Sequence, residues 1–391
     1  MTRVAFAALP AYGHLLPMVP LAQAFQRQGA EVRIASAGPL LPRLPLRAQR
    51  GFEPDVTLED LTGRAVADFP ALRDDPDRRW PAVFFGRVNA ALAMPHLREA
   101  WSEWRPDLLV YDATDAGAAV VADELGIPRI AFGILDWAPL LGVLPEVARR
   151  ALEPVDAVPP PWEQVETGLA SSPDSIPLTY LDSFPLRWRS GERPVPQELL
   201  DLRPVAFSLQ GSEDIPPEPR GRGRPLVYVT LGTVANRRVE ALRAAIVGAG
   251  SLDVDVLVAA GPDAELGPMD DLPSNVTVRG WVDQPAVLES AAVAIHHGGV
   301  GTLCACAAAG VPQLLLPQLA DQPHNAERVA EVGPGRVLRR DEVTADAVSA
   351  LTAELLAEGP HRAECALLAG EIAAMPAPHE VAARLLARID R

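Results

Sequence analysis

Short apolar runs alternate with longer periodic segments along the first half of the chain, as in α/β proteins. Buried strands are predicted for the apolar runs at 4–9, 31–36, 108–111, 129–132 and 177–181. Helices are predicted for the segments at 14–28, 80–104 and 116–125. Gly29 and Gly126 supply stop signals after two of these helices. A strand, a helix and a second strand in this order predict a parallel sheet.

The same alternation begins again after a polar stretch that is broken by proline and glycine. Residues 207–224 form this stretch and are predicted to be a linker. Strands are predicted beyond it at 225–231, 254–259, 276–279, 293–295, 313–316 and 336–338. Helices are predicted at 236–248, 303–309, 345–356, 362–375 and 379–389. The expected organisation is an N-terminal domain at 1–206, a second domain at 225–375 and a terminal helical segment at 376–391.

One segment of the first half lacks a clear period. Acidic and proline residues alternate with short apolar runs at 39–79, which predicts loops with one or two short helices. The aromatic residues of the next segment, 80–104, could either pack in the core or line a pocket, and packing is the more general role of such residues.

Composition narrows the class of function. The chain has 391 residues, 48% of them hydrophobic, and a formal net charge of −16. This acidic balance argues against nucleic acid and anionic membranes as partners. Three cysteines (Cys304, Cys306 and Cys365) form no disulfide framework, and no further ligands at metal spacing accompany them. Because the sequence shows neither a signal peptide nor an apolar run of roughly 20 residues, we expect a cytoplasmic protein.

The stretch at 292–326, which contains a glycine-rich loop, is the most informative one. It reads strand, HHGGVGT, helix, GVP break and strand. Glycines let backbone N–H groups approach a ligand, and a helix N-terminus attracts anions, so the loop suits a phosphate or diphosphate. His297 could add a hydrogen bond, and Thr302 is placed to cap the helix and offer its hydroxyl. The alternative is a tight turn that needs glycine for packing alone; Asp321 and Gln322 after the next strand favour a site.

Two polar residues follow strands of the first half at the edge where open α/β sheets bind ligands. His14 follows the first strand and could act as a general base. Asp112 ends the 108–111 strand and could fix the tautomer of that histidine. A capping or packing role remains open for both side chains, and Asp115 competes with Asp112 for either role.

Three segments together resemble a known signature. HHGGVGT, AAGVPQLLLP and ADQPHNA are similar to the donor-binding signature of nucleotide-sugar-dependent glycosyltransferases, especially the actinobacterial enzymes that glycosylate natural products. These are related to the plant secondary-metabolite glycosyltransferases. The signature spans 281–325, and a weaker resemblance extends over almost the whole chain. It implies a GT-B fold, in which two doubly wound Rossmann-like domains face each other across a cleft and the last helix returns to the first domain.

The resemblance also implies roles for individual residues. His14, in AYGHLLP, falls on the catalytic histidine, and Asp112, in PDLLVYD, on its partner. The diphosphate site would comprise His297, Gly299, Val300, Gly301, Thr302 and Thr233. The nucleobase and ribose would meet Trp281, Val282 and Gln284, and the donor sugar Asp321 and Gln322. Candidates for an apolar acceptor are Tyr12, Phe84, Phe85, Trp137 and Leu140. The unspecialised alternatives are core packing for Trp281, an ordinary loop hydroxyl for Thr233 and a helix N-cap for Asp321.

One position departs from the plant enzymes. These carry a glutamate that binds both ribose hydroxyls, and the register set by His297 and Thr302 puts Ala305 in its place. A methyl group accepts no hydrogen bond, and a deoxyribose lacks the 2′-hydroxyl. A lost hydrogen-bond pair matters by about 1 kcal/mol, which favours a dTDP-deoxysugar over a UDP-sugar without settling the choice.

The expected activity is inverting transfer of a sugar from a nucleotide donor to an apolar, polyketide-like natural product, with no cofactor and no metal. Transfer to oxygen and transfer to carbon both stay open, as does a homodimer. Rival functions are a nucleotide-sugar epimerase of the same fold and a non-enzymatic nucleotide-sugar-binding accessory protein. An NAD-dependent oxidoreductase fits less well, because no GxGxxG motif follows the first strand. The presence of both His14 and Asp112 favours an enzyme.

Overall fold

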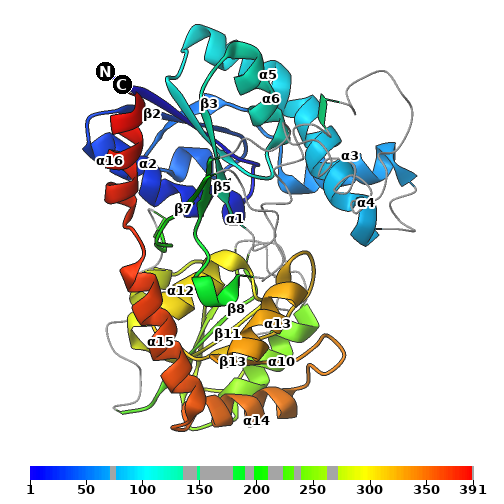
Figure 1. The fold of residues 1–391 in the computed structure, drawn as a ribbon. Coiled ribbons are helices and arrows are strands. Elements are labelled where there is room, and N and C mark those ends of the chain that lie inside the picture. Colours follow the sequence, from blue (N-terminus) through cyan, green and yellow to red (C-terminus); the bar gives the residue numbers. More distant parts are fainter. Residues whose placement is uncertain are drawn as a thin grey trace. The chain divides into compact units, whose positions relative to one another are not determined.

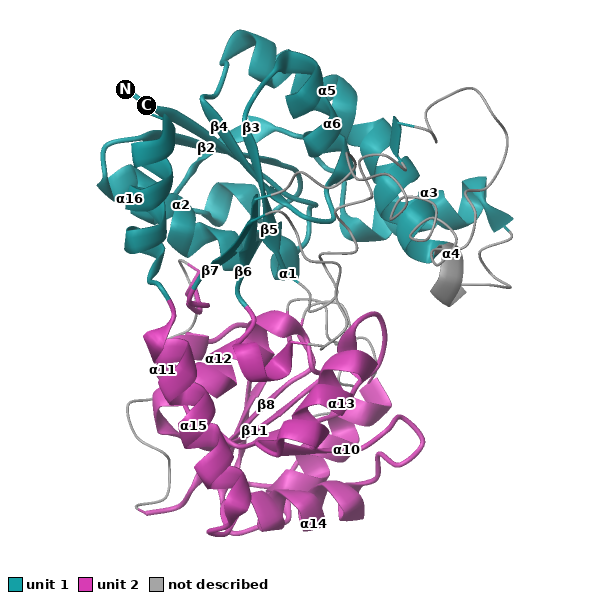
Figure 2. Ribbon diagram, viewed as in Figure 1, with its two compact units in different colours: residues 1–183, 190–202, 376–391 teal, residues 184–189, 203–375 magenta. Residues whose placement is uncertain are grey.

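The computed structural model describes residues 1–70, 76–134, 148–149, 179–189, 198–209, 223–232, 239–261 and 272–389, with side chains omitted at 76–79. The chain divides into two compact units (Figure 2). Unit 1 comprises 1–183, 190–202 and 376–391, and unit 2 comprises 184–189 and 203–375.

Unit 1 is built on a seven-stranded parallel sheet (Figure 1). The strands are β1 (Arg3–Ala7), β2 (Glu31–Ser36), β3 (Arg47–Arg50), β4 (Leu108–Asp112), β5 (Arg129–Gly133), β6 (Thr179–Asp182) and β7 (Glu198–Asp201). Their order in the sheet is β3-β2-β1-β4-β5-β6-β7. The direction of winding therefore reverses between β1 and β4, which is where open α/β sheets bind ligands.

Helical segments complete unit 1. They are α1 (Tyr12–Leu15), η1 (Leu16–Met18), α2 (Val19–Arg27), η2 (Leu41–Arg43), α3 (Leu58–Asp68), α4 (Pro76–Val83), η4 (Phe84–Asn89), α5 (Ala90–Glu103), α6 (Ala116–Leu125) and α16 (Pro378–Ile389). The expected helix at 14–28 is interrupted by a 3-10 turn at η1, and the expected helix at 80–104 contains the π-helical turn η4. Pattern reasoning missed β3 and β7, because RAQR and ELLD are short and lack an apolar run.

Unit 2 contains a six-stranded parallel sheet in the order β10-β9-β8-β11-β12-β13. The strands are β8 (Leu226–Thr230), β9 (Asp255–Ala259), β10 (Val276–Arg279), β11 (Ala291–His296), β12 (Gln313–Leu315) and β13 (Gly335–Val337). The helical elements are η5 (Leu186–Trp188), α10 (Val239–Gly250), α11 (Gln284–Ser290), α12 (Val300–Ala308), α13 (Gln322–Val332), α14 (Ala345–Leu356) and α15 (Pro360–Ala374).

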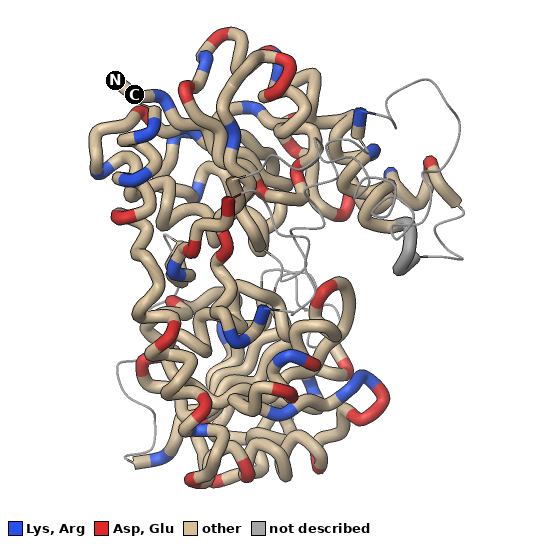
Figure 3. The backbone as a smooth tube through the Cα atoms, viewed as in Figure 1, with Lys and Arg blue, Asp and Glu red and all other residues tan. Residues whose placement is uncertain are grey.

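The central strands of both sheets are buried inside their units. All five residues of β4 and of β8 are buried, as expected for parallel strands covered on both faces. Acidic and basic residues are interspersed along the described parts of both units (Figure 3). Within the described residues, no helix combines the length and apolar character needed to cross a membrane.

Candidate active site

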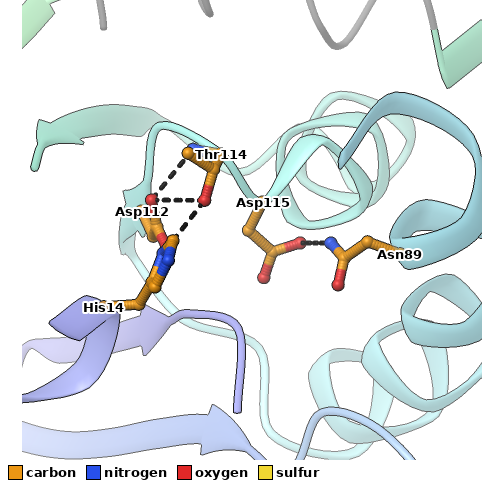
Figure 4. Close-up of polar contacts among 5 residues, drawn as sticks. All are labelled: His14, Asn89, Asp112, Thr114 and Asp115. Carbon is orange, nitrogen blue, oxygen red and sulfur yellow. Dashed lines mark hydrogen bonds and ion pairs between the residues drawn. The ribbon is translucent and has the colours of Figure 1, made fainter. Parts of the chain in front are cut away.

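The winding reversal in unit 1 brings His14 and Asp112 together. β1 and β4 are parallel neighbours, with Ala7 opposite Tyr111, so the segments that leave their carboxyl ends start side by side. His14 lies on α1, just beyond β1, and Asp112 is the last residue of β4. His14 Nδ1 lies 2.5 Å from Asp112 Oδ2 (Figure 4). The Asp112 side chain is fully buried, whereas that of His14 is 18% exposed.

Thr114 completes this arrangement, and sequence reasoning did not find it. Its hydroxyl donates to Asp112 Oδ1 over 2.8 Å, and its backbone N–H donates to the same oxygen over 2.9 Å. The hydroxyl oxygen also lies 3.2 Å from His14 Nδ1. An aspartate that accepts from Nδ1–H selects the tautomer whose lone pair is on Nε2. The pair thus has the geometry of a base and its orienting carboxylate.

Asp115 takes the capping role, which is one of the two roles for which it competed with Asp112. It is the N-cap of α6 and accepts from the Ala118 backbone N–H over 3.1 Å. Its Oδ1 also accepts from Asn89 Nδ2 over 3.3 Å. Burial raises the pKa of Asp115 to about 7, and the nearby Asp112 carboxylate adds to this shift. Of the two aspartates, Asp112 is the one whose carboxylate contacts His14 in the structure.

The structure places the five acceptor candidates in different surroundings. The Phe85 ring is half-buried and lies 6.4 Å from the His14 ring, measured between centroids. Tyr12 is the first residue of the helix that carries His14. Phe84 is only 2% exposed and stacks on Trp80 in the core, so its expected role in lining a pocket gives way to packing. Trp137 and Leu140 lie outside the described residues.

In unit 2 the glycine-rich loop joins β11 to α12 as predicted. Gly298 has φ +90°, a conformation that favours glycine, and Gly299 is the N-cap of α12. The first-turn N–H groups, from Val300 onward, are the ones that a helix leaves for an external acceptor. The expected cap at Thr302 is wrong: no side chain among the described residues caps α12, and Thr302 is the third residue of this helix. Thr233 lies outside the described residues.

The two histidines of the loop differ in their surroundings. His297 packs between two glycines: an added Cβ would lie 2.6 Å from its Cε1 at Gly232 and 2.3 Å from its Nε2 at Gly299. Burial of the ring and the neighbouring His296 lower the pKa of His297 to about 3, against an opposing hydrogen bond to the Thr230 backbone. His297 is therefore neutral near pH 7, so a ligand at this loop would meet an uncharged imidazole.

His296 is fully buried, and its pKa is lowered to about 4 by that burial. It accepts from the Gly298 N–H at Nδ1 over 3.0 Å and contacts Gln313 Oε1 from Nε2 over 2.8 Å. The proton of the neutral ring is therefore on Nε2, because Nδ1 must accept. His296 supports the loop from inside, which is a role that the sequence pattern did not reveal.

The nucleobase candidates lie at the start of α11. Trp281 follows β10 and is partly exposed, whereas the Val282 side chain is 7% exposed and belongs to an apolar cluster. Gln284 Nε2 lies 3.3 Å from Thr302 Oγ1 and 3.4 Å from the Tyr228 hydroxyl. Gln284 and the first turn of α12 are therefore neighbours. If Val282 meets a nucleotide, it does so through its backbone.

Asp321 and Gln322 begin α13 after Ala320, which has φ +58°. Asp321 is the N-cap by position, but its side chain makes no cap bond. Its Oδ2 instead accepts from Asn325 Nδ2 over 2.7 Å. Gln322 Oε1 accepts from two backbone N–H groups, at Gln318 (2.9 Å) and Leu319 (3.1 Å). Any bond from Gln322 to a sugar would therefore come from Nε2.

Two further observations bear on ligands. Among the described residues, no group of three His, Cys, Asp or Glu side chains is arranged to hold a metal ion. Ala305 lies one turn after Thr302 in α12 and is 7% exposed.

The sequence was compared with protein families and with characterised proteins, and both comparisons point to the same family. Residues 236–388 match the family described as erythromycin biosynthesis protein CIII-like, C-terminal domain. The chain is 33% identical to the elloramycin glycosyltransferase ElmGT of Streptomyces olivaceus, over 98% of this chain and 96% of that protein. It is 31% identical to the L-demethylnoviosyl transferase of Streptomyces niveus, over 98% of each.

Solved structures of other glycosyltransferases resemble this chain over nearly its full length. The glycosyltransferase SnogD from Streptomyces nogalater is 26% identical, with a TM-score of 0.77 over 99% of each chain. The glycosyltransferase VinC, solved in complex with dTDP, is 25% identical, with a TM-score of 0.73 over 100% of each chain. The chain therefore belongs to the nucleotide-sugar-dependent glycosyltransferases of antibiotic and natural-product biosynthesis, and it has their GT-B fold.

Proposed function

We propose that this glycosyltransferase transfers a deoxysugar from a dTDP-linked donor to an apolar aglycone, with inversion at the anomeric carbon. The observation that carries the proposal is the contact between His14 and the buried Asp112 at the winding reversal. In this assignment unit 1 binds the acceptor and unit 2 binds the donor. The hydroxyl oxygen of the acceptor is the expected nucleophile. Attack from a ring carbon is the alternative, and it would give a C-glycoside.

His14 acts as the general base. Asp112 accepts from Nδ1–H, so the Nε2 lone pair removes the proton of the acceptor hydroxyl. The oxygen forms a bond to the anomeric carbon while the bond from that carbon to the diphosphate breaks. The electron pair of the broken bond stays on the diphosphate. His14 becomes an imidazolium, which the Asp112 carboxylate stabilises.

The start of α12 receives the charge that develops on the diphosphate. Its first-turn N–H groups and the positive end of its dipole favour an anion. Because His297 is neutral, it contributes a hydrogen bond rather than a full charge. Thr302 adds a hydroxyl, and Thr233 is assigned here from the resemblance alone. Donors placed where charge develops stabilise the transition state.

The preference for dTDP rests on Ala305 and on the relative solved with dTDP. Ala305 supplies no acceptor for a ribose 2′-hydroxyl, so a ribonucleotide would leave a polar group without a partner. A deoxyribose has no such group to satisfy. Trp281 would stack on the base, Gln284 would lie near the base or ribose, and Asp321 with Gln322 would meet sugar hydroxyls.

Calorimetric titration of dTDP and of UDP into the wild type and His297→Ala tests the donor site. Tighter binding of dTDP, weakened in the variant, is the expected result. Preference for UDP would refute the Ala305 argument and leave the loop assignment intact. Absence of binding by folded wild type would refute the donor-site assignment as a whole.

Turnover of a dTDP-deoxysugar with a panel of hydroxylated apolar aglycones tests the dyad. His14→Ala should abolish transfer and keep dTDP affinity, and Asp112→Asn should reduce transfer by a factor of about 100 or more, because the wrong tautomer is favoured. The anomeric configuration of the product, read by NMR, tests inversion. Conversion of the donor without any acceptor would indicate an epimerase instead.

A further inference from the structure

The backbone N–H and the backbone carbonyl of Gly298 are both hydrogen-bonded to buried side chains. Its N–H donates to His296 Nδ1 over 3.0 Å, and its carbonyl accepts from Asn325 Nδ2 over 2.8 Å. His296 is 0% exposed and Asn325 is 1% exposed. A loop residue at φ +90° is thus fixed from two sides, directly before the N-cap of α12.

Asn325 also reaches the expected sugar side of the donor site. The second hydrogen of its amide donates to Asp321 Oδ2 over 2.7 Å. Both neighbours of Nδ2 are oxygen acceptors, so the amide can be oriented in only one way: a flipped side chain would place its own oxygen against them. Asn325 Oδ1 is buried without a partner among the described residues, which leaves the NH₂ group as the functional end of the side chain.

We propose that Asn325 is a positioning residue that fixes the diphosphate loop relative to Asp321, through one NH₂ group shared by Gly298 and the Asp321 carboxylate. This inference rests on the proposed function, because it takes the loop as the diphosphate site and Asp321 as a sugar contact. Through Gly298, Asn325 sets where the N–H groups of α12 converge. Through Asp321, it donates a hydrogen bond to a carboxylate that is assigned to the donor sugar.

A matched control is present in the same unit. Asn275 Nδ2 also donates to two oxygens, the carbonyls of Leu252 and Val254, at 3.3 and 2.7 Å. Like Asn325, Asn275 therefore uses one NH₂ group to bind two oxygen acceptors, but it does not contact the β11–α12 loop. Asn325→Ala and Asn275→Ala should both lower the melting temperature. Asn325→Ala alone should weaken dTDP binding, by about tenfold for the loss of one buried hydrogen bond that holds the loop.

A double exchange separates the two arms of the side chain. Asn325→Asp replaces both donors with an oxygen that faces two acceptors, so melting temperature and dTDP affinity should both fall. Combining it with Asp321→Asn restores a donor and an acceptor between the two positions but gives Gly298 no donor. The combined variant should recover part of the lost melting temperature and remain weak in dTDP binding.

Calorimetry with dTDP and thermal melting of the five proteins decide between the outcomes. Wild-type affinity in Asn325→Ala, with only the melting temperature lowered, would overturn the proposal, and so would recovery of dTDP affinity in the double exchange. If the folded wild type binds no dTDP, the proposed donor site fails and this inference fails with it. Wild-type binding together with an unaffected Asn325→Ala would leave the donor site standing and refute the positioning role alone.

Discussion

At Asp112, neighbouring groups hold both carboxylate oxygens: Oδ2 by His14 and Oδ1 by the hydroxyl and N–H of Thr114. The His297 ring is likewise held in place by its neighbours, because it packs between Gly232 and Gly299. In each case a residue that makes no chemical step, Thr114 or a glycine, helps to fix a residue of the proposed site. Sequence reasoning predicted roles for His14, Asp112 and His297 from their positions at or after strand ends and from the resemblance. It missed Thr114 and Asn325, whose importance depends on contacts across the fold.

Thr114→Val should lower the turnover number by about tenfold, because the isosteric side chain cannot donate to Asp112 and the carboxylate is then less firmly held. Thr114→Ser keeps the hydroxyl and should recover most of the rate. Steady-state kinetics measures both, with dTDP affinity as the control that should not change. Equal rates in the valine and serine variants would show that the hydroxyl does not position the dyad.

Gly232→Ala should abolish detectable dTDP binding, since its Cβ would collide with the His297 ring at a site with φ +71°. Gly223→Ala is the control, because Gly223 has φ +90° and an added Cβ there would meet nothing within 4 Å among the described residues. Both substitutions carry the same backbone cost, about 1–2 kcal/mol for a side chain in the left-handed region. Calorimetry and thermal melting separate that shared loss of stability from the specific loss of binding.

At the scale of elements, pattern reasoning placed β11, the loop and α12 correctly because an apolar run, a glycine cluster and a small-residue helix have distinct signals. It did not foresee the π-helical turn η4, where Asn89 reaches Asp115 and Phe85 approaches His14. Such a turn inserts a residue into an ordinary helical pattern, and nothing local to 84–89 requires it. Packing against the neighbouring elements selects it.

The support of the β11–α12 loop by His296 should make unit 2 sensitive to acid. The folded pKa of about 4 lies below the unfolded value of about 6.5, so falling pH favours the unfolded, protonated chain. The stabilisation is complete above about pH 6.5 and is lost progressively towards pH 4, at roughly 1 kcal/mol per pH unit.

Denaturant unfolding between pH 4.5 and 7 measures this dependence. His296→Asn retains an acceptor for the Gly298 N–H but cannot titrate, so its unfolding free energy should depend less steeply on pH than that of the wild type. His297 has a shift in the same direction and supplies the slope that remains. An unchanged slope in His296→Asn would contradict the assignment.

At the scale of the whole molecule, the chain leaves unit 1 and returns to it twice, the second time through 376–391. α16 then packs within unit 1, where Val381, Ala382 and Leu385 are buried and Gln28 Nε2 donates to the His379 carbonyl over 2.7 Å. The domain roles, acceptor in unit 1 and donor in unit 2, remain a proposal.

The attachment of α16 should depend on Arg388. It donates to both oxygens of Glu198 on β7 (2.6 and 2.8 Å), and this lowers the pKa of Glu198 to about 2. Both side chains are about one-third or more exposed, so solvent screening limits the gain to about 1 kcal/mol or less. Because the folded pKa lies below the unfolded one, the gain is present above about pH 4.5 and is lost as the pH falls towards 2.

Limited proteolysis of Arg388→Ala at pH 7 should show faster cleavage near 375–378, together with a lower melting temperature. Arg336→Ala, which removes another exposed pair, with Glu354 in unit 2, is the control and should not accelerate that cleavage. The melting-temperature difference between wild type and Arg388→Ala should narrow below pH 4. A difference that stays unchanged from pH 5 down to pH 2 would show that Arg388 does not act through the Glu198 carboxylate.

The sequence by itself determined the α/β class, the order of most elements, the donor signature and the pair of residues proposed as base and orienter. It could do so because period, glycine clusters and strand ends are local signals. Only the tertiary structure decided that Asp112 rather than Asp115 contacts His14, that Thr302 does not cap α12, that Phe84 is a core residue, and that Asn325 links Gly298 to Asp321. These outcomes depend on which side chains meet across separate elements, and a hydrogen bond within about 3 Å is set by the three-dimensional path of both segments rather than by either sequence alone.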